Sequence, residues 1–452
     1  GPSEAQSVAI IGASMQDDLI VTAPMGYEVS QTQAGLYTNI LTLSPIDGSL
    51  QEMVYVRLAA DLDEGFYSGT MNIASGSTSA SLSLSGEVST GSDPLVPYTF
   101  IGTTSPSWNE ASNWLGNEVP GEGAAVVIDG ICELDVDANL ASLTVNEGKS
   151  ITVPNGKTLT AEAITTTDAA QLVVADGGQL LGNVGGVLAT VQKNIVGYGS
   201  DNSVITGWNS VASPLNGNIS PTVVGNMITE TTYDLFRFDQ SAGMEWLNYK
   251  AENFDLSPGM GYLYANSEDV TLYFMGSLYE GNGTVSLIHD ADAHFPGWNL
   301  VGNPFTHTVY IDRPYYTLNE DGSEIISVMG NTVEVAEGVF VVAEAENETV
   351  IFSTEAPGSK STTLAVNITQ NRGTIIDRAI VRFGEGSTLP KFMLNESHTK
   401  VYIPQDNKDY AVVSVIENNV MPINFKAAKN GTYTMNFSTE EVTFSYLHLI
   451  DN

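Results

Sequence analysis

The chain has little positive charge, because its 452 residues include 16 lysines and arginines against 53 aspartates and glutamates, a formal net charge of −37. A field of this sign repels the phosphates of nucleic acids and the anionic headgroups of lipids. We therefore exclude nucleic acids and anionic membrane surfaces as partners. No run of about 18 apolar residues is present, so the sequence also predicts no insertion into a bilayer.

Cysteine is almost absent, since Cys132 is the one thiol in the sequence. A single cysteine excludes a disulfide within the chain and a zinc site built from several thiolates. The apolar neighbours Ile131 and Leu134 predict that this thiol is buried and has a packing role.

The short motifs of several enzyme classes are also missing. The sequence contains no G-x-S-x-G nucleophile turn, no H-E-x-x-H zinc motif and no G-x-x-x-x-G-K-[ST] phosphate loop. Carboxylate pairs such as Asp135 and Asp137 could flank a glycosidic bond, but with 53 acidic residues such pairs arise by chance. A catalytic triad assembled from distant segments stays open. We expect a protein without enzymatic activity.

Alternation of apolar and polar residues, in short runs that end at Gly, Pro, Asn or Asp, fills most of the chain. This pattern is typical of half-buried strands and predicts an all-β protein. Residues 1–90 contain about seven such runs, which favours an immunoglobulin-like β-sandwich. Residues 91–97 carry two prolines and no periodicity, so they are interpreted as a linker.

The apolar runs become shorter and more regular in the following hundred residues. SLTV, SITV, TLTA, QLVV and QLLG are separated by turns rich in glycine. Evenly spaced short strands indicate a small β-solenoid, in which each rung buries its apolar residues against the next; a compact sandwich is the alternative. Trp108 and Trp114, near the start of this region, are expected to be core residues that cap the open end of the solenoid.

An internal repeat follows. The segment GWNSVASPL from Gly207 matches GWNLVGNPF from Gly297 at an offset of 90 residues, and GYLYA from Gly261 matches VFVVA from Val339 at an offset of 78. The difference of 12 residues predicts an insertion in the first copy, within residues 236–250. We expect two homologous sandwich-like units, or two halves of one larger sandwich, with the same strand order.

Strand-like runs continue to the last residues, where YLHLIDN alternates with Tyr446, His448 and Ile450 on one face. We expect this strand either to be an open edge, through which the chain self-associates or which further strands complete, or to be paired on both sides within the chain. The predicted domains are an immunoglobulin-like sandwich at 1–90, a short β-solenoid at 98–195, duplicated β-sandwich-like units at 196–362 and a C-terminal β-domain at 363–452.

Three stretches carry a family resemblance. The N-terminal LIVTAPMGYEVSQ, the segment WNEASNWLGNEVPGEGAAVVIDG, and GWNLVGNPF with the C-terminal LHLIDN together resemble the secreted and surface multidomain β-proteins of Bacteroidota, which are often cargo of type IX secretion. The resemblance covers most of the chain and implies export to the medium or the cell surface. It implies little about activity, because such modules accompany proteases, glycosidases and adhesins alike.

Potential metal ligands cluster in one place, HDADAH, which offers His289, Asp290, Asp292 and His294. On an extended strand, Asp290, Asp292 and His294 would share one face and could hold a hard cation or zinc. A solvated turn is the alternative. Calcium is a second candidate, because acidic residues cluster at three further places. These are Asp61, Asp63 and Glu64; Asp135 and Asp137; and Glu320, Asp321 and Glu324.

Trp246 and Tyr249 lie in the predicted insertion, where a loop could present their rings to a sugar or to a partner protein. The alternative is that Trp246 packs at the edge of a sandwich. We therefore expect a non-enzymatic adhesion or scaffold protein, secreted or at the cell surface, whose partners are glycans or proteins of a cell surface. The noncatalytic portion of a secreted hydrolase, or a carbohydrate-binding surface protein, are the alternatives.

Overall fold

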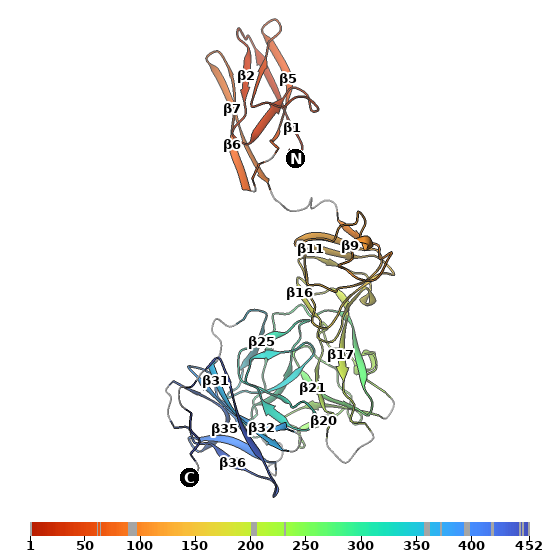
Figure 1. Ribbon diagram of the computed structural model, residues 1–452, viewed down its shortest axis with the longest axis vertical. Helices are drawn as coiled ribbons and strands as arrows, with labels where there is room; N and C mark the ends of the chain where they lie inside the picture. Colours follow the sequence, from red (N-terminus) through yellow and green to blue (C-terminus); the bar gives the residue numbers. More distant parts are fainter. Residues whose placement is uncertain are drawn as a thin grey trace. The chain divides into compact units, whose positions relative to one another are not determined.

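The computed structural model describes residues 2–60, 62–63, 65–88, 97–199, 206–229, 232–356, 362–370, 373–392, 398–416, 420–442, 444 and 447–450. Strands dominate, and the helices among these residues are three single turns of 3-10 type, so the predicted all-β class is confirmed. In this part of the chain no helix is long and apolar enough to span a membrane. The chain divides into two compact units, Gly1–Asp93 and Pro94–Asn452 (Figure 1).

The first unit is a sandwich of two antiparallel sheets. Alternate residues of each strand point inward, and Val21, Val54 and Met71, from strands of both sheets, are fully buried in the core between them. One sheet has the order β1 (Gln6–Ala13), β5 (Ser49–Leu58), β3 (Tyr27–Ser30). The other has the order β4 (Ile40–Leu43), β2 (Leu19–Thr22), β6 (Gly65–Ser75), β7 (Thr78–Val88).

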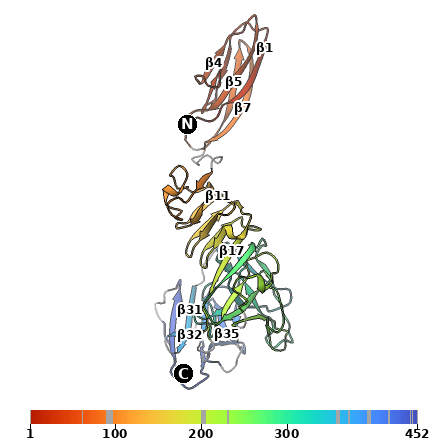
Figure 2. The same cartoon turned by 90° about the vertical axis from the view of Figure 1, so that its right-hand side faces the viewer.

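The second unit begins with a β-solenoid, as the evenly spaced short runs predict. Its strands stack in parallel as rungs (Figure 2). Inward residues such as Leu143, Ile151 and Leu159 are fully buried. One sheet has the order β16 (Gln179–Gly182), β13 (Thr158–Ala161), β11 (Ala138–Val145), β9 (Ala124–Ile128), β8 (Tyr98–Phe100), with β14 (Ile164–Thr165) beside β11. The other begins with β10 (Ile131–Glu133), β12 (Ser150–Val153), β15 (Leu172–Val174), β17 (Leu188–Ile195).

Two tryptophans close the start of the solenoid around the 3-10 turn η1 (Ala111–Asn113). Trp108 and Trp114 meet edge to face with centroids 4.7 Å apart, and the Trp114 indole N–H donates to the Trp108 carbonyl at 2.7 Å. Phe100 packs edge-on against Trp114. Both tryptophans are buried, as expected of core residues.

The internal repeat forms two four-stranded antiparallel sheets with the same strand order, which confirms the prediction from the matched motifs. The first is β18 (Asn209–Ala212), β21 (Gly261–Asn266), β19 (Tyr233–Phe238), β20 (Trp246–Asn248). The second is β24 (Trp298–Gly302), β29 (Gly338–Val342), β26 (Tyr316–Leu318), β27 (Ile325–Ser327).

The strand pairing corrects two details of the repeat. Ala212 pairs with Gly261, and Gly302 pairs with Gly338, so Gly261 corresponds to Gly338 rather than to Val339. The insertion is also elsewhere than predicted. The hairpins β19–β20 and β26–β27 are of nearly equal length, and residues 236–250 therefore hold no long insertion.

The extra residues of the first copy precede β19. The bridge of Ile219 to Leu256 corresponds to the pairing of Val309 with Val333. The registers of the two hairpins make Phe236 equivalent to Tyr316. The segment from Ile219 to Phe236 is about ten residues longer than the equivalent segment from Val309 to Tyr316. This added segment contains the 3-10 turn η3 (Pro221–Val223).

Further strands fix the copies to their surroundings. In the first copy β22 (Val270–Ser277) pairs antiparallel with β17 and so extends a solenoid sheet. Tyr262 and Leu272 of this copy share one buried core with solenoid residues such as Leu172. The second copy adds a four-stranded sheet of β23 (Thr284–Ser286), β30 (Thr349–Ser353), β25 (Val309–Ile311), β28 (Thr332–Val333).

The C-terminal sheet is buried on both faces. In β31, Ala365 joins a core with Trp298 and Phe238 of the two copies, and the next residue, Val366, faces a separate core. The described sheet order is β36 (Asn424–Lys426), β34 (Lys400–Gln405), β35 (Lys408–Val415), β32 (Thr374–Phe383), β31 (Thr362–Gln370), β37 (Thr434–Glu440), with β33 (Leu389–Pro390) beside β35.

The expected strand YLHLIDN is not formed over residues 447–450, which lie outside any strand and expose Leu447, Leu449 and Ile450. Tyr446 and the final two residues lie outside the described residues. The last strand of the described order is instead β37, which pairs with β31. An open edge at YLHLIDN is therefore wrong for the described part of that segment, because its backbone is not extended into a sheet.

Candidate functional site

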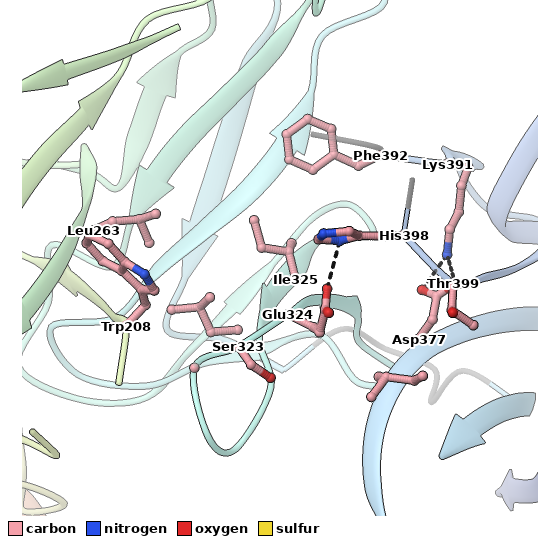
Figure 3. Close-up of a pocket in the computed structure, with 13 residues that line it drawn as sticks. Trp208, Leu263, Ser323, Glu324, Ile325, Asp377, Lys391, Phe392, His398 and Thr399 are labelled. Carbon is pink, nitrogen blue, oxygen red and sulfur yellow. Dashed lines mark hydrogen bonds and ion pairs between the residues drawn. The ribbon is translucent and has the colours of Figure 1, made fainter. Parts of the chain in front are cut away.

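A pocket of about 200 Å³ lies where the two copies meet the C-terminal sheet (Figure 3). Trp208 and Leu263 of the first copy form one wall, and the hairpin β26–β27 of the second copy supplies Glu324. The remaining wall comes from the C-terminal sheet and its loops. Its polar residues are Asp377, Lys391, His398 and Thr399.

Asp377 of β32 and Lys391, just after β33, form a buried ion pair that lines the pocket. The Lys391 ammonium nitrogen lies 2.5 Å and 2.6 Å from the two carboxylate oxygens of Asp377. The backbone N–H of Val401 donates to Asp377 Oδ2 at 2.7 Å, which holds the carboxylate in place. Only 3% of the Lys391 side chain and 6% of the Asp377 side chain are exposed.

Burial affects the ionisation of the Lys391 amine. Loss of hydration lowers the pKa of the Lys391 amine, and the neighbouring carboxylate of Asp377 offsets part of that effect. Desolvating two charges is expensive, and their mutual attraction in the interior compensates only when the geometry is close. The two contacts at hydrogen-bond distance supply that geometry.

A second pair stands at the more exposed side of the pocket. Glu324 Oε2 lies 3.0 Å from His398 Nδ1, and about half of the His398 side chain is exposed. Burial raises the pKa of the Glu324 carboxyl, His398 lowers it in part, and the charge of Asp377 raises it again. The site therefore offers a carboxyl and an imidazole that can exchange a proton beside a buried amine and carboxylate.

Equivalent tryptophans have different surroundings in the two copies. Trp298 stacks on Phe392 with centroids 4.0 Å apart, whereas Trp208 packs edge-on against Phe236 and lines the pocket. Gly207 and Gly297, one residue before each tryptophan, both have positive φ angles of 81° and 76°. Glycine adopts this backbone region without strain, which accounts for the glycine in both copies of the motif.

The predicted metal ligands do not form a site. Residues 291–297 are turns and bends, so the extended strand on which Asp290, Asp292 and His294 would share a face is absent. Gln240 accepts the backbone N–H of Asp290, and His294 Nδ1 lies 3.1 Å from Glu245. Within the described ranges, which include His289 and the other three residues, no three His, Cys, Asp or Glu residues are placed to hold a metal ion.

The acidic clusters that favoured calcium have hydrogen-bonded carboxylates. Asp135 accepts from the Ser107 hydroxyl and the Asn109 N–H, and Asp137 accepts from the Thr158 N–H. In the first cluster, Asp61 and Glu64 lie outside the described residues. In the third cluster, Glu324 lines the pocket described above, whereas Glu320 does not. Calcium binding stays a prediction, which equal unfolding temperatures in EDTA and in millimolar calcium at constant ionic strength would contradict.

The two aromatic residues expected to bind a ligand have packing roles. Tyr249 is buried and meets Phe254 edge-on. Trp246 is half-buried and packs edge-on against Phe238 at 5.2 Å. They contribute to different cores, so they do not form the shared exposed surface that sugar stacking requires.

Sequence reasoning missed the pocket residues, apart from Glu324 as a member of an acidic cluster. Asp377 and Lys391 are separated by 14 residues and belong to no motif. Lys391 lies in a strand-rich segment next to the apolar Phe392, which is only a weak signal of burial. Lysine is seldom fully buried without a partner, and the sequence does not show the partner.

A family model described as a domain of unknown function, DUF8693, matches residues 99–332, more than half of the chain. The chain belongs to this family. No curated protein and no solved structure matches the chain. The DUF8693 match spans the solenoid, the first copy and most of the second copy. Glu324 and Trp208 therefore lie within the DUF8693 region, whereas Asp377, Lys391 and His398 come from the segment that follows it.

Proposed function

We propose that this DUF8693 protein is a non-enzymatic adhesion or scaffold protein, secreted or at the cell surface, in which an immunoglobulin-like module precedes a rigid β-rich body. The observation that carries the proposal is the continuity of the buried cores in the second unit. One core joins the solenoid to the first copy, and another joins both copies to the C-terminal sheet. Such a body transmits load and holds surfaces at fixed positions, which is the work of a scaffold.

The acidic surface and the resemblance to surface proteins of Bacteroidota also support the proposal. A chain with a net charge of −37 is repelled by nucleic acids and other polyanions, which disfavours a role that depends on binding them. Trp246 and Tyr249, the aromatic ligand candidates from the sequence, take part in packing, which further favours a structural role.

Force spectroscopy on the full chain tests the scaffold role. We expect the second unit to resist as one body and to unfold in a single major event, separate from that of the sandwich at Gly1–Asp93. Unfolding of the solenoid, the copies and the C-terminal sheet in separate low-force steps would contradict the proposal.

A panel of chromogenic glycosides, esters and peptides tests the absence of catalysis. We expect no turnover by the wild-type chain. Turnover that is lost in Glu324→Gln would show that the pocket is catalytic and that the chain is part of a hydrolase.

A second candidate function, carbohydrate binding, is favoured by the walls of the pocket. Trp208 and Leu263 form an apolar wall opposite Glu324 and His398, which can donate to and accept from hydroxyl groups. This combination suits one face and the rim of a sugar ring. A glycan array should then give binding that Trp208→Ala abolishes and that Leu115→Ala, an exposed substitution in the solenoid, leaves unchanged.

A further inference from the structure

The buried pair of Asp377 and Lys391 has the geometry of two groups placed to react. The amine nitrogen is 2.5 Å and 2.6 Å from the two carboxyl oxygens, so it contacts both of them at nearly the same distance (Figure 3). Both side chains are buried in the lining of the pocket, and the Val401 N–H donates to the carboxyl group. Holding a nucleophile against its electrophile in this way replaces a bimolecular encounter by a unimolecular step.

The surroundings favour the reactive, uncharged form of the Lys391 amine. An ammonium and a carboxylate that are removed from water become an amine and a carboxylic acid when one proton passes from Lys391 to Asp377. Burial lowers the pKa of Lys391, which assists this transfer. The uncharged amine has a free lone pair, and the protonated carboxyl group has a hydroxyl that can leave.

We infer that Lys391 and Asp377 join in an intramolecular amide bond. The lone pair of Lys391 Nζ forms a bond to Asp377 Cγ, and the bond from Cγ to one oxygen breaks. The departing hydroxyl takes one proton from the attacking nitrogen and leaves as water. Amine and carboxylic acid thus become one amide and one water, and nothing is oxidised or reduced.

Glu324 is the carboxyl group that can carry the proton from the nitrogen to the leaving hydroxyl. It lines the same pocket, and it lies close enough to Asp377 to feel its charge. His398 lies 3.0 Å from Glu324 and is half exposed, so the pair connects the buried reaction to solvent. The pocket also gives the released water a path out.

The bond would fasten two segments that meet only through folding. Asp377 lies in β32, and Lys391 follows β33, which is held beside β35. The backbone N–H of Lys391 already donates to the carbonyl of Asp409 in β35. An amide at this point would lock the loop between β32 and β33 onto the sheet.

The mass of the intact, denatured full chain tests the inference directly. We expect a mass lower than that calculated from the sequence by one water. A population that has the full calculated mass throughout would overturn the inference, because the pair would then be only an ion pair.

Peptide mapping locates the bond. After trypsin digestion we expect a branched product in which residues 373–378 are joined to residues 383–400, with no cleavage at Lys391. The pair of Lys193 and Asp176, partly exposed and 3.8 Å apart, is an internal control that should give unmodified peptides. Recovery of all the linear peptide that ends at Lys391 would overturn the inference.

Variants identify the reacting groups. Lys391→Arg keeps the positive charge but removes the nucleophilic amine, and it should have its full calculated mass. Loss of one water from this variant would overturn the assignment. Glu324→Gln should form the bond roughly 100-fold more slowly, because proton transfer loses its carrier. Complete bond formation in freshly made Glu324→Gln would overturn the role of Glu324, while the wild-type peptide map tests the bond independently.

Discussion

His307 is a buried imidazole without a hydrogen bond. Only 6% of the residue is exposed, and neither ring nitrogen has a partner of good geometry among the described residues. Burial lowers the pKa of His307, and the nearby backbone of Leu180 offsets only part of this effect. The folded chain therefore holds this ring in its neutral form.

This burial predicts a loss of stability in mild acid. Above about pH 6.5 the ring is neutral in both states and has no effect, whereas below that value the unfolded chain binds a proton that the folded chain does not. We expect His307→Leu to reduce the fall in unfolding free energy between about pH 7.5 and about pH 5 by on the order of 1 kcal/mol. Urea unfolding at both pH values measures this difference.

The control is Leu115→Ala, which alters an exposed side chain that carries no titratable group. Its pH dependence should match that of the wild type. If His307→Leu kept the full wild-type pH dependence, protonation of His307 would not be the cause.

Cys132 is the other residue whose burial controls its chemistry. The thiol is 1% exposed in the core of the solenoid. Burial, reinforced by the charges of Asp135 and Glu133, raises its pKa, so the reactive thiolate is scarce. We expect no reaction with a thiol reagent in the native protein and stoichiometric reaction in denaturant. Rapid labelling of the folded chain would contradict this assignment.

The tryptophan cap stabilises the first end of the solenoid. Trp114 contacts Phe100 and Trp108 edge-on and donates a hydrogen bond within this cluster. Trp114→Ala should lower the free energy of unfolding by about 3–5 kcal/mol, because it leaves a cavity and an unpaired carbonyl. Leu115→Ala, at an exposed neighbour, should cost little. Equal effects of the two changes in urea unfolding would contradict a capping role.

The alternation of apolar and polar residues predicts most of the strands, because successive side chains of a half-buried strand point in turn to the core and to solvent. The rungs of the solenoid and the shared strand order of the copies follow from patterns within a few residues. The register of the match between GYLYA and VFVVA does not follow from such patterns. The sequence alignment places Val339 opposite Gly261, whereas the strand pairing gives Gly338. Glycine has no apolar signal, and only the hydrogen-bonded ladder fixes its place.

The pocket could not be predicted, because each of its charged pairs forms between different elements of the fold and belongs to no local motif. Glu324 comes from the second copy and His398 from the loop before β34. The sequence predicts instead the cluster at HDADAH, where proximity along the chain suggests a shared face. A turn held by Gln240 separates those side chains.

The whole molecule should unfold in two steps, because Gly1–Asp93 and Pro94–Asn452 are compact units with separate cores. Met71→Ala, in the first core, should lower only one calorimetric transition. Leu159→Ala, in the solenoid, should lower only the other transition. Each change should reduce the free energy of unfolding of its own unit by about 2–5 kcal/mol. A single transition that both changes shift equally would contradict two independent units.

The two copies of the internal repeat are no longer interchangeable. The first shares its core with the solenoid, whereas the second builds a core with its own added sheet. Trp298 is stacked on Phe392, while its counterpart Trp208 lines the pocket. Recombination between the two repeats in the gene would therefore give chains in which the exchanged copy does not fit the parts of the fold that surround it. Selection against such products would drive the two copies apart in sequence, which leaves short matches such as the GWN motif as the visible record of the duplication.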